Sequence, residues 1–174
     1  PLNTAQEKSI REQIVFYKRH RELFQYGRFY CLAAPEADHG GSWMVVSKDR
    51  RRAAVLEMTG LLQPNASMPP LRLAGLEETY CYQVSLRQQS VELDSFRTLL
   101  NHVLPLKLKA DGMLVHLAGE LYQMPCEQIT FTASGDLLMH AGLRPPQRFC
   151  GTGYTDGVRP MPDFSARIWL LESN

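Results

Sequence analysis

The hydrophobic pattern of this chain changes at Gly27, and the change limits the fold more than any other feature of the sequence. Before it, apolar side chains recur at the spacing of an α-helix and form one narrow stripe, made of Ile10, Ile14, Tyr17 and Phe24. Phe16, His20 and Leu23 widen this stripe on one side to about half of the helix circumference. A stripe of that width predicts contact with two neighbours rather than one.

The same segment carries signals for both ends of a helix. Thr4 and Glu7 have the spacing of a capping box, which satisfies the free N–H groups of a first helical turn. Gly27 occupies the position at which glycine commonly ends a helix. We therefore predict one long helix over residues 5–26.

Beyond Gly27 the sequence is typical of short strands separated by turns. The predicted strands are 28–33, 42–47, 52–62, 71–75, 79–85, 129–133, 136–142 and 165–171. The helical spacing of Leu93, Phe96 and Val103 predicts a short helix inserted near 93–104, whereas 113–124 fits either a helix or a strand. The predicted fold is mainly β: an antiparallel β-sandwich preceded by one long N-terminal α-helix.

The charge balance argues against a nucleic-acid partner, and the apolar stretches are too short for a membrane span. The chain has 174 residues, enough for one domain, and 19 basic against 18 acidic residues give a net charge of +1. Nucleic-acid binding needs a concentrated basic surface, and the one basic run, 48–52, is interpreted as a solvated hairpin tip. No stretch has the roughly 20 consecutive apolar residues of a membrane span.

The cysteines favour a reducing environment. Cys31, Cys81, Cys126 and Cys150 lie far apart and form no C-x-x-C motif. We expect reduced, half-buried thiols in a cytoplasmic protein.

Five blocks of sequence occur in an order known from one family. They are IREQIVFYKRHRELFQYGRFYCL, SWMVVSKDRRRAAV, LRLAGLEETYCYQV, SGDLLMHAGLRPP and DFSARIWLL. This order resembles the C-terminal end of the α-galactosidases of glycoside hydrolase family 36. The resemblance extends from about residue 8 to residue 171 and is weakest over residues 86–130.

The resemblance implies that residues 1–27 are the last helix of a catalytic (β/α)8 barrel that this chain lacks, and that residues 28–174 form a C-terminal β-sandwich domain. The parent enzyme would hydrolyse terminal α-galactosides such as melibiose or raffinose, with retention and without a cofactor. This chain alone would be inactive and would support the barrel and its assembly. Its expected partners are the missing barrel and a second copy that associates through the N-terminal helix. Without the barrel, we expect the helical stripe to fold back onto the sandwich or to contact that copy.

No residue is predicted to be catalytic, cofactor-binding or metal-binding. Retaining glycosidases use two carboxyl groups about 5–5.5 Å apart, and the family's aspartates lie in barrel motifs that this sequence lacks. The acidic residues next to turns or strand ends, Glu77, Glu78, Asp136 and Asp163, are interpreted as structural.

The other reactive residue types also favour structural roles. His116 and Glu120 share a face if their segment is helical, but no third metal ligand is near in sequence. His20, His39, His102 and His140 are predicted to be packed or solvated. Cys150 lacks a recognisable histidine partner, and the glycines at 151–153 precede no lysine of a phosphate loop.

Two further functions remain alternatives. The aromatic residues in and near strands, Trp43, Trp169, Tyr80, Tyr82, Tyr122 and Tyr154, raise the hypothesis of a platform for sugar rings in a carbohydrate-binding module. Burial in the core is the favoured interpretation, because both tryptophans lie inside apolar strands. The second alternative is a free-standing protein-interaction domain.

Overall fold

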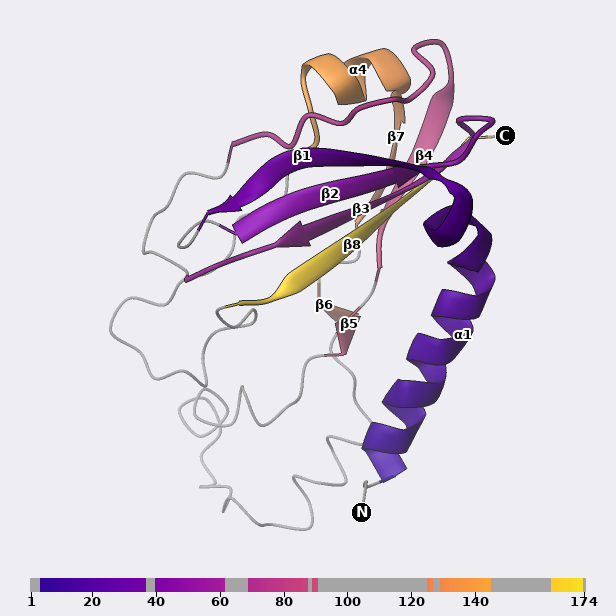
Figure 1. Ribbon diagram of the computed structural model, residues 1–174, viewed down its shortest axis with the longest axis vertical. Coiled ribbons are helices and arrows are strands. Elements are labelled where there is room, and N and C mark those ends of the chain that lie inside the picture. The colour runs from indigo at the N-terminus through magenta and orange to yellow at the C-terminus, as the bar shows by residue number, and fades with distance from the viewer. Residues whose placement is uncertain are drawn as a thin grey trace, which may run out of the picture.

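The computed structural model describes residues 4–36, 40–61, 69–87, 89–90, 125–126, 129–144 and 164–173 (Figure 1). In chain order its elements are α1 (Thr4–Tyr26), β1 (Arg28–Glu36), β2 (Gly40–Val46), β3 (Arg52–Met58), β4 (Cys81–Leu86), β5 (Gln89–Ser90), β6 (Pro125–Cys126), β7 (Thr130–Ser134), α4 (Gly135–His140) and β8 (Ala166–Glu172). The helix predicted over residues 5–26 and a mainly β body behind it are confirmed, with α1 beginning one residue earlier. The predicted segments 93–104 and 113–124 lie outside the described residues.

One six-stranded sheet, in the order β1-β2-β3-β8-β4-β7, forms the body of the domain. Every strand pairing in it is antiparallel, as predicted. The last strand of the chain, β8, lies in the middle, where Val55 of β3 faces Trp169 and Val84 of β4 faces Leu171. The short strands β5 and β6 form a second, two-stranded sheet.

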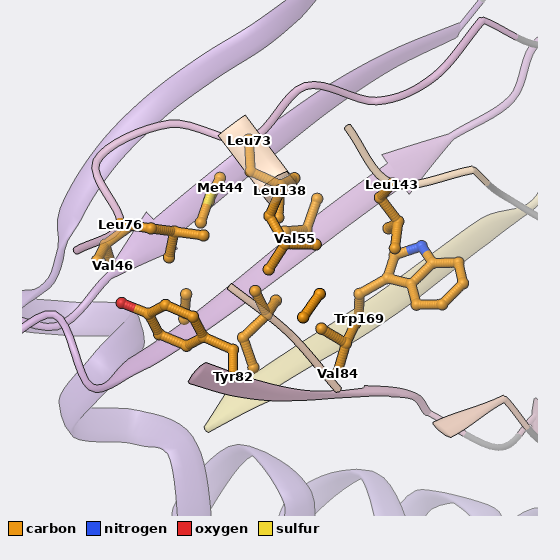
Figure 2. Packing of buried hydrophobic residues seen from close by; sticks show 13 residues of the cluster. Met44, Val46, Val55, Leu73, Leu76, Tyr82, Val84, Leu138, Leu143 and Trp169 are labelled. Atoms are coloured by element: carbon orange, nitrogen blue, oxygen red, sulfur yellow. The ribbon is translucent and has the colours of Figure 1, made fainter. Parts of the chain in front are cut away.

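Alternation along the strands gives the large sheet one buried face, called here the core face. Met44, Val55, Tyr82 and Trp169 lie on it, and each of them is fully buried. Figure 2 shows these side chains meeting Leu73, Leu76, Leu138 and Leu143, which come from the segment over residues 69–80 and from α4 and its C-terminal end. Burial of one such side chain stabilises the fold by about 1.5–3 kcal/mol. The opposite side of the sheet is called the outer face.

The prediction of a strand over residues 136–142 is wrong, because Gly135–His140 form helix α4. The Ser134 side chain accepts a hydrogen bond from the backbone N–H of Leu137, which caps the helix. Leu138 points into the core while Leu137 stays exposed. A short apolar run of this kind fits the period of a helix as well as that of a strand, so the sequence pattern did not decide between them.

The predicted strand over residues 71–75 is also wrong. Leu71 makes only an isolated antiparallel bridge with Leu143, through backbone hydrogen bonds of 2.7 and 2.8 Å. The Leu73 N–H then donates to the carbonyl of Leu138 at the end of α4, and Gly75 takes a positive φ of 72°. The segment therefore follows α4 over the core face instead of joining the sheet.

Gly27 ends α1 as predicted, although not through a left-handed conformation. The described glycines with positive φ are Gly40, Gly75 and Gly142. A Cβ on Gly27 would lie 2.5 Å from the Leu23 carbonyl oxygen and 2.5 Å from Val45 Cγ1. Gly27 is thus needed because the helix end approaches β2 closely.

The predicted hairpin tip at 48–52 is confirmed between β2 and β3. Asp49 organises it, because its carboxylate accepts hydrogen bonds from the Ser47 hydroxyl and the Arg51 N–H. These hydrogen bonds lower the pKa of Asp49. Arg50 has a positive φ of 59° in the same turn.

Tyr82 ties this hairpin tip to the segment that crosses the core face. Its hydroxyl donates to the Arg50 carbonyl at 2.6 Å and accepts from the Glu77 N–H at 3.0 Å. Arg50 and Glu77 also form an ion pair of 3.0 Å. Burial raises the pKa of the Tyr82 hydroxyl, which therefore remains protonated and able to donate at neutral pH.

The Tyr82 hydroxyl should contribute measurably to stability. We predict that Tyr82→Phe lowers the free energy of unfolding by about 1–3 kcal/mol, because two backbone groups lose a buried partner. Tyr80→Phe is the matched control, since the neighbouring half-buried ring has no hydroxyl hydrogen bond among the described residues. Urea denaturation measures both, and equal losses in the two variants would contradict this role.

Candidate functional site

Helix α1 buries only part of its apolar surface in the described structure. Figure 1 shows its C-terminal end meeting the sheet beside β1, while its N-terminal end extends away from the sheet. Leu23 is 3% exposed and His20 8% exposed, so this side of the helix packs on the domain. Ile10, Ile14 and Tyr17, called here the exposed stripe, are 44%, 47% and 46% exposed.

This arrangement rules out one of the two alternatives predicted for the stripe. The stripe does not fold back onto the sheet, because Ile10, Ile14 and Tyr17 keep nearly half of their surface exposed. The apolar stripe is wide enough for two neighbours, and the sheet covers only the side that carries His20 and Leu23. Contact with a second copy of the chain stays a prediction.

His20 is a packed residue of α1, as predicted. Its ring lies 4.8 Å from the Phe16 ring, between centroids. Burial lowers the pKa of His20, the charges of Arg19, Arg52 and Arg87 lower it further, and the charge of Glu172 opposes them. The imidazole is therefore neutral at pH 7.

A groove of about 630 Å³ runs between α1 and the outer face of β4 and β8, and is called here the helix groove. It is lined by Lys8, Arg11, Glu12, Val15, Phe16, Arg19, His20, Gln83, Ser85, Arg87, Leu170 and Glu172. The Arg87 guanidinium lies 3.8 Å from the centroid of the Phe16 ring and donates to Gln13 Oε1 at 2.9 Å. Burial lowers the pKa of Arg87, which nevertheless stays charged at neutral pH. The sequence did not indicate this groove, because its lining residues come from three segments that are more than 60 positions apart along the chain.

The described acidic candidates have neighbours that suit structural roles. Glu77 pairs with Arg50, and Asp136 lies 3.4 Å from His140 in the exposed first turn of α4. The Asp136 N–H donates to the Glu78 carbonyl, which joins the two segments through their backbone. That these residues are not catalytic stays a prediction, and Asp163 lies outside the described residues.

The aromatic residues divide between the core and the surface. Trp169 and Tyr82 are fully buried, so neither contributes to a sugar platform. Trp43 is half-buried on the outer face, and the Arg51 guanidinium lies 5.0 Å from the centroid of the half-buried Tyr80 ring. Tyr122 and Tyr154 lie outside the described residues.

A buried polar row on the core face was missed by sequence reasoning. Ser42, Glu57 and Arg167 face one another across β2, β3 and β8, and Arg167 is only 1% exposed. Trp169 Nε1 donates to Glu57 Oε2 at 3.5 Å. Alternation along the strands could have predicted this row, because each of these residues lies two positions from Met44, Val55 or Trp169 and therefore on the same face of the sheet. This row lies inside the core and has no access for a substrate.

The remaining predicted residue types give no metal site in the described part. Within those residues no three His, Cys, Asp or Glu side chains gather as metal ligands. Cys31 and Cys81 are free thiols but exposed, so their expected half-burial is wrong. Several candidates lie outside the described residues, namely His39, His102, His116, Glu120, Cys150, residues 151–153 and the side chain of Cys126.

Neither α1 nor α4 is both long and apolar enough to cross a membrane.

Comparison with known proteins places most of this chain in one family. Residues 41–171 match the profile of the glycosyl hydrolase family 36 C-terminal domain. The chain is 36% identical over 83 residues to α-galactosidase AgaA of Geobacillus stearothermophilus and 34% identical over 84 residues to α-galactosidase 1 of Pediococcus pentosaceus. These matches cover 48% and 47% of this chain and 11% of each relative.

A solved structure resembles the whole chain. The family 36 α-galactosidase AgaB of Geobacillus stearothermophilus superposes with a TM-score of 0.63 and 25% identity, over 99% of this chain and 16% of that protein. The chain thus spans about a tenth of its curated relatives and about a sixth of this structure.

Neutral, buried His20 should make stability depend on pH. Its pKa is lower in the folded than in the unfolded chain, so unfolding takes up protons and stability falls as the pH drops below about 6.5. We predict that His20→Gln reduces the stability lost between pH 7.5 and pH 5.5. Urea midpoints of both proteins at both pH values measure this, and an unchanged pH dependence in His20→Gln would contradict it.

Proposed function

Because the chain belongs to the glycosyl hydrolase family 36 C-terminal domain family, we propose that it acts as the non-catalytic C-terminal domain of an α-galactosidase. In this role it supports a catalytic barrel and the assembly of the enzyme. The parent enzyme would hydrolyse terminal α-galactosides, such as melibiose or raffinose, with retention and without a cofactor.

The exposed stripe of α1 is the observation that carries this proposal. Ile10, Ile14 and Tyr17 lie on the half of the helix that the sheet does not cover. Burial of each side chain would contribute about 1.5–3 kcal/mol, so an adjacent apolar partner is favoured. The last helix of a barrel has such partners on the helices and strands beside it.

The extent of the similarity also supports a separate catalytic barrel followed by this C-terminal domain. A (β/α)8 barrel takes about 250 residues, more than this chain has. The matched region is 16% of AgaB, so most of that α-galactosidase lies outside the similarity. We therefore assign residues 1–27 to the barrel edge and residues 28–174 to the domain that follows it.

The barrel-facing role of the exposed stripe is testable in a chimera. We replace the matching C-terminal region of Geobacillus stearothermophilus AgaA with this chain and measure the yield of active enzyme with an aryl α-galactoside. Ile14→Asp should lower that yield by about tenfold or more, because it removes at least about 1.5 kcal/mol of burial.

Val15→Asp is the matched control for this chimera. Val15 is the next residue and is 66% exposed, but it lies about 100° further round the helix, away from the stripe. It should leave the yield within about twofold of the parent chimera, a difference below about 0.5 kcal/mol. Equal losses from both substitutions would contradict a specific contact through the stripe.

The purified 174-residue chain should itself show no α-galactosidase activity. We expect no turnover of an aryl α-galactoside and no specific heat of binding for galactose or raffinose in titration calorimetry. Turnover would contradict the non-catalytic assignment. Saturable heat would favour the carbohydrate-binding alternative, which the burial of Trp169 and Tyr82 disfavours.

A further inference from the structure

The helix groove lies on the opposite flank of α1 from the exposed stripe and differs from it in chemistry. Its floor is formed by β4 and β8, where Gln83, Ser85 and Leu170 alternate with the buried core residues. Phe16 and Val15 close it on the helix side. The groove thus combines an apolar lining with polar groups at its base.

The groove carries an excess of positive charge. Four of its lining residues are cationic, namely Lys8, Arg11, Arg19 and Arg87, whereas Glu12 and Glu172 supply two carboxylates. Burial keeps the pKa of His20 below its usual value, so the imidazole is counted as neutral at pH 7 and the lining has a net charge of +2. The whole chain has a net charge of only +1, which makes the groove a local concentration of positive charge.

The cationic side chains of the groove form no ion pair with a carboxylate of the described residues. Among the described residues, ion pairs join Arg50 with Glu77, Arg52 with Glu22 and His140 with Asp136, and none of these six residues lines the groove. Arg87 is held in place by Gln13 and the Phe16 ring, and the carboxylate of Glu12 attracts it without forming an ion pair in the described structure. A fixed guanidinium binds a carboxylate at a lower entropic cost than a flexible one.

The dimensions of the groove suit an extended polypeptide. Its helix wall runs from Lys8 to His20, a length of about 18 Å at 1.5 Å per residue. An extended chain of about five residues covers the same length at about 3.3 Å per residue. Arg11 and Arg19 lie about 12 Å apart along the helix axis, close to the separation of residues i and i+4 on one side of such a chain.

We propose that the helix groove binds an extended acidic segment of a partner polypeptide, with carboxylates at alternate positions facing Arg11, Arg19 and Arg87. A sugar ring is disfavoured as the occupant, because the Arg87 guanidinium already covers the Phe16 ring that would stack on it. The acidic side chains bind the cations, and the small residues between them lie on Leu170 and Val15. This inference does not depend on the barrel-facing role of the exposed stripe, because it concerns the other flank of the helix.

Peptide titration of the 174-residue chain tests this proposal. The probe is the acetylated, amidated pentapeptide EAEAE, and the matched neutral peptide is QAQAQ. Amide chemical shifts of residues 83–87 are followed by nuclear magnetic resonance at low ionic strength. We expect saturable shifts with EAEAE, no saturation with QAQAQ, and weaker binding as sodium chloride is added.

A pair of charge-reversal variants separates the groove from general electrostatics. Arg19→Glu should weaken EAEAE binding by about tenfold, whereas Lys18→Glu should change it by less than about twofold, equivalent to about 0.4 kcal/mol. The two substitutions alter net charge equally, but Lys18 does not line the groove. Arg11→Glu serves as the second groove variant if Arg19→Glu does not fold.

Three outcomes would overturn the proposal. The first is equal binding of EAEAE and QAQAQ, and the second is equal weakening by Arg19→Glu and Lys18→Glu. The third is binding of inorganic phosphate or citrate at least as tight as that of EAEAE, which would reduce the groove to a small-anion site. Failure of the AgaA chimera would leave these measurements unaffected.

Discussion

The rest of the structure depends on the pairing of β8 with β3 on one side and with β4 on the other. This pairing joins the N-terminal strands β1, β2 and β3 to the later strands β4 and β7 in one sheet. Trp169 and Leu171 of β8 then lie between Val55 and Val84 on the core face. Since β3 and β8 are more than 100 residues apart in sequence, this pairing is a long-range contact that closes the core at a high entropic cost.

Once this sheet is formed, its two faces have different roles. The core face is closed by α4 and the segment over residues 69–80, which together bury the large apolar side chains (Figure 2). The outer face receives α1, and Gly27 allows the helix end to approach Val45. The sheet therefore fixes the direction of a helix whose N-terminal part lies beyond it (Figure 1).

Helix α1 consequently presents two surfaces of different chemistry. The exposed stripe is apolar and suits a large, permanent partner such as a barrel, because its stabilisation comes from the area removed from water. The helix groove on the other flank is charged, and suits a peptide whose binding depends on ionic strength. One helix of 23 residues therefore provides both surfaces proposed here for contacts with other polypeptides.

The sequence by itself determined the long helix with its ends, most strands and the antiparallel class of the fold, because local periodicity and turn residues carry that information. It also predicted a wide stripe with two neighbours, of which the sheet is one. It did not determine the state of residues 136–142, where a serine cap and the burial of Leu138 selected a helix. Nor did it reveal the burial of Glu57 and Arg167 or the groove beside Arg87. These features depend on which strands become neighbours, and only the tertiary structure, through the central position of β8, decides that.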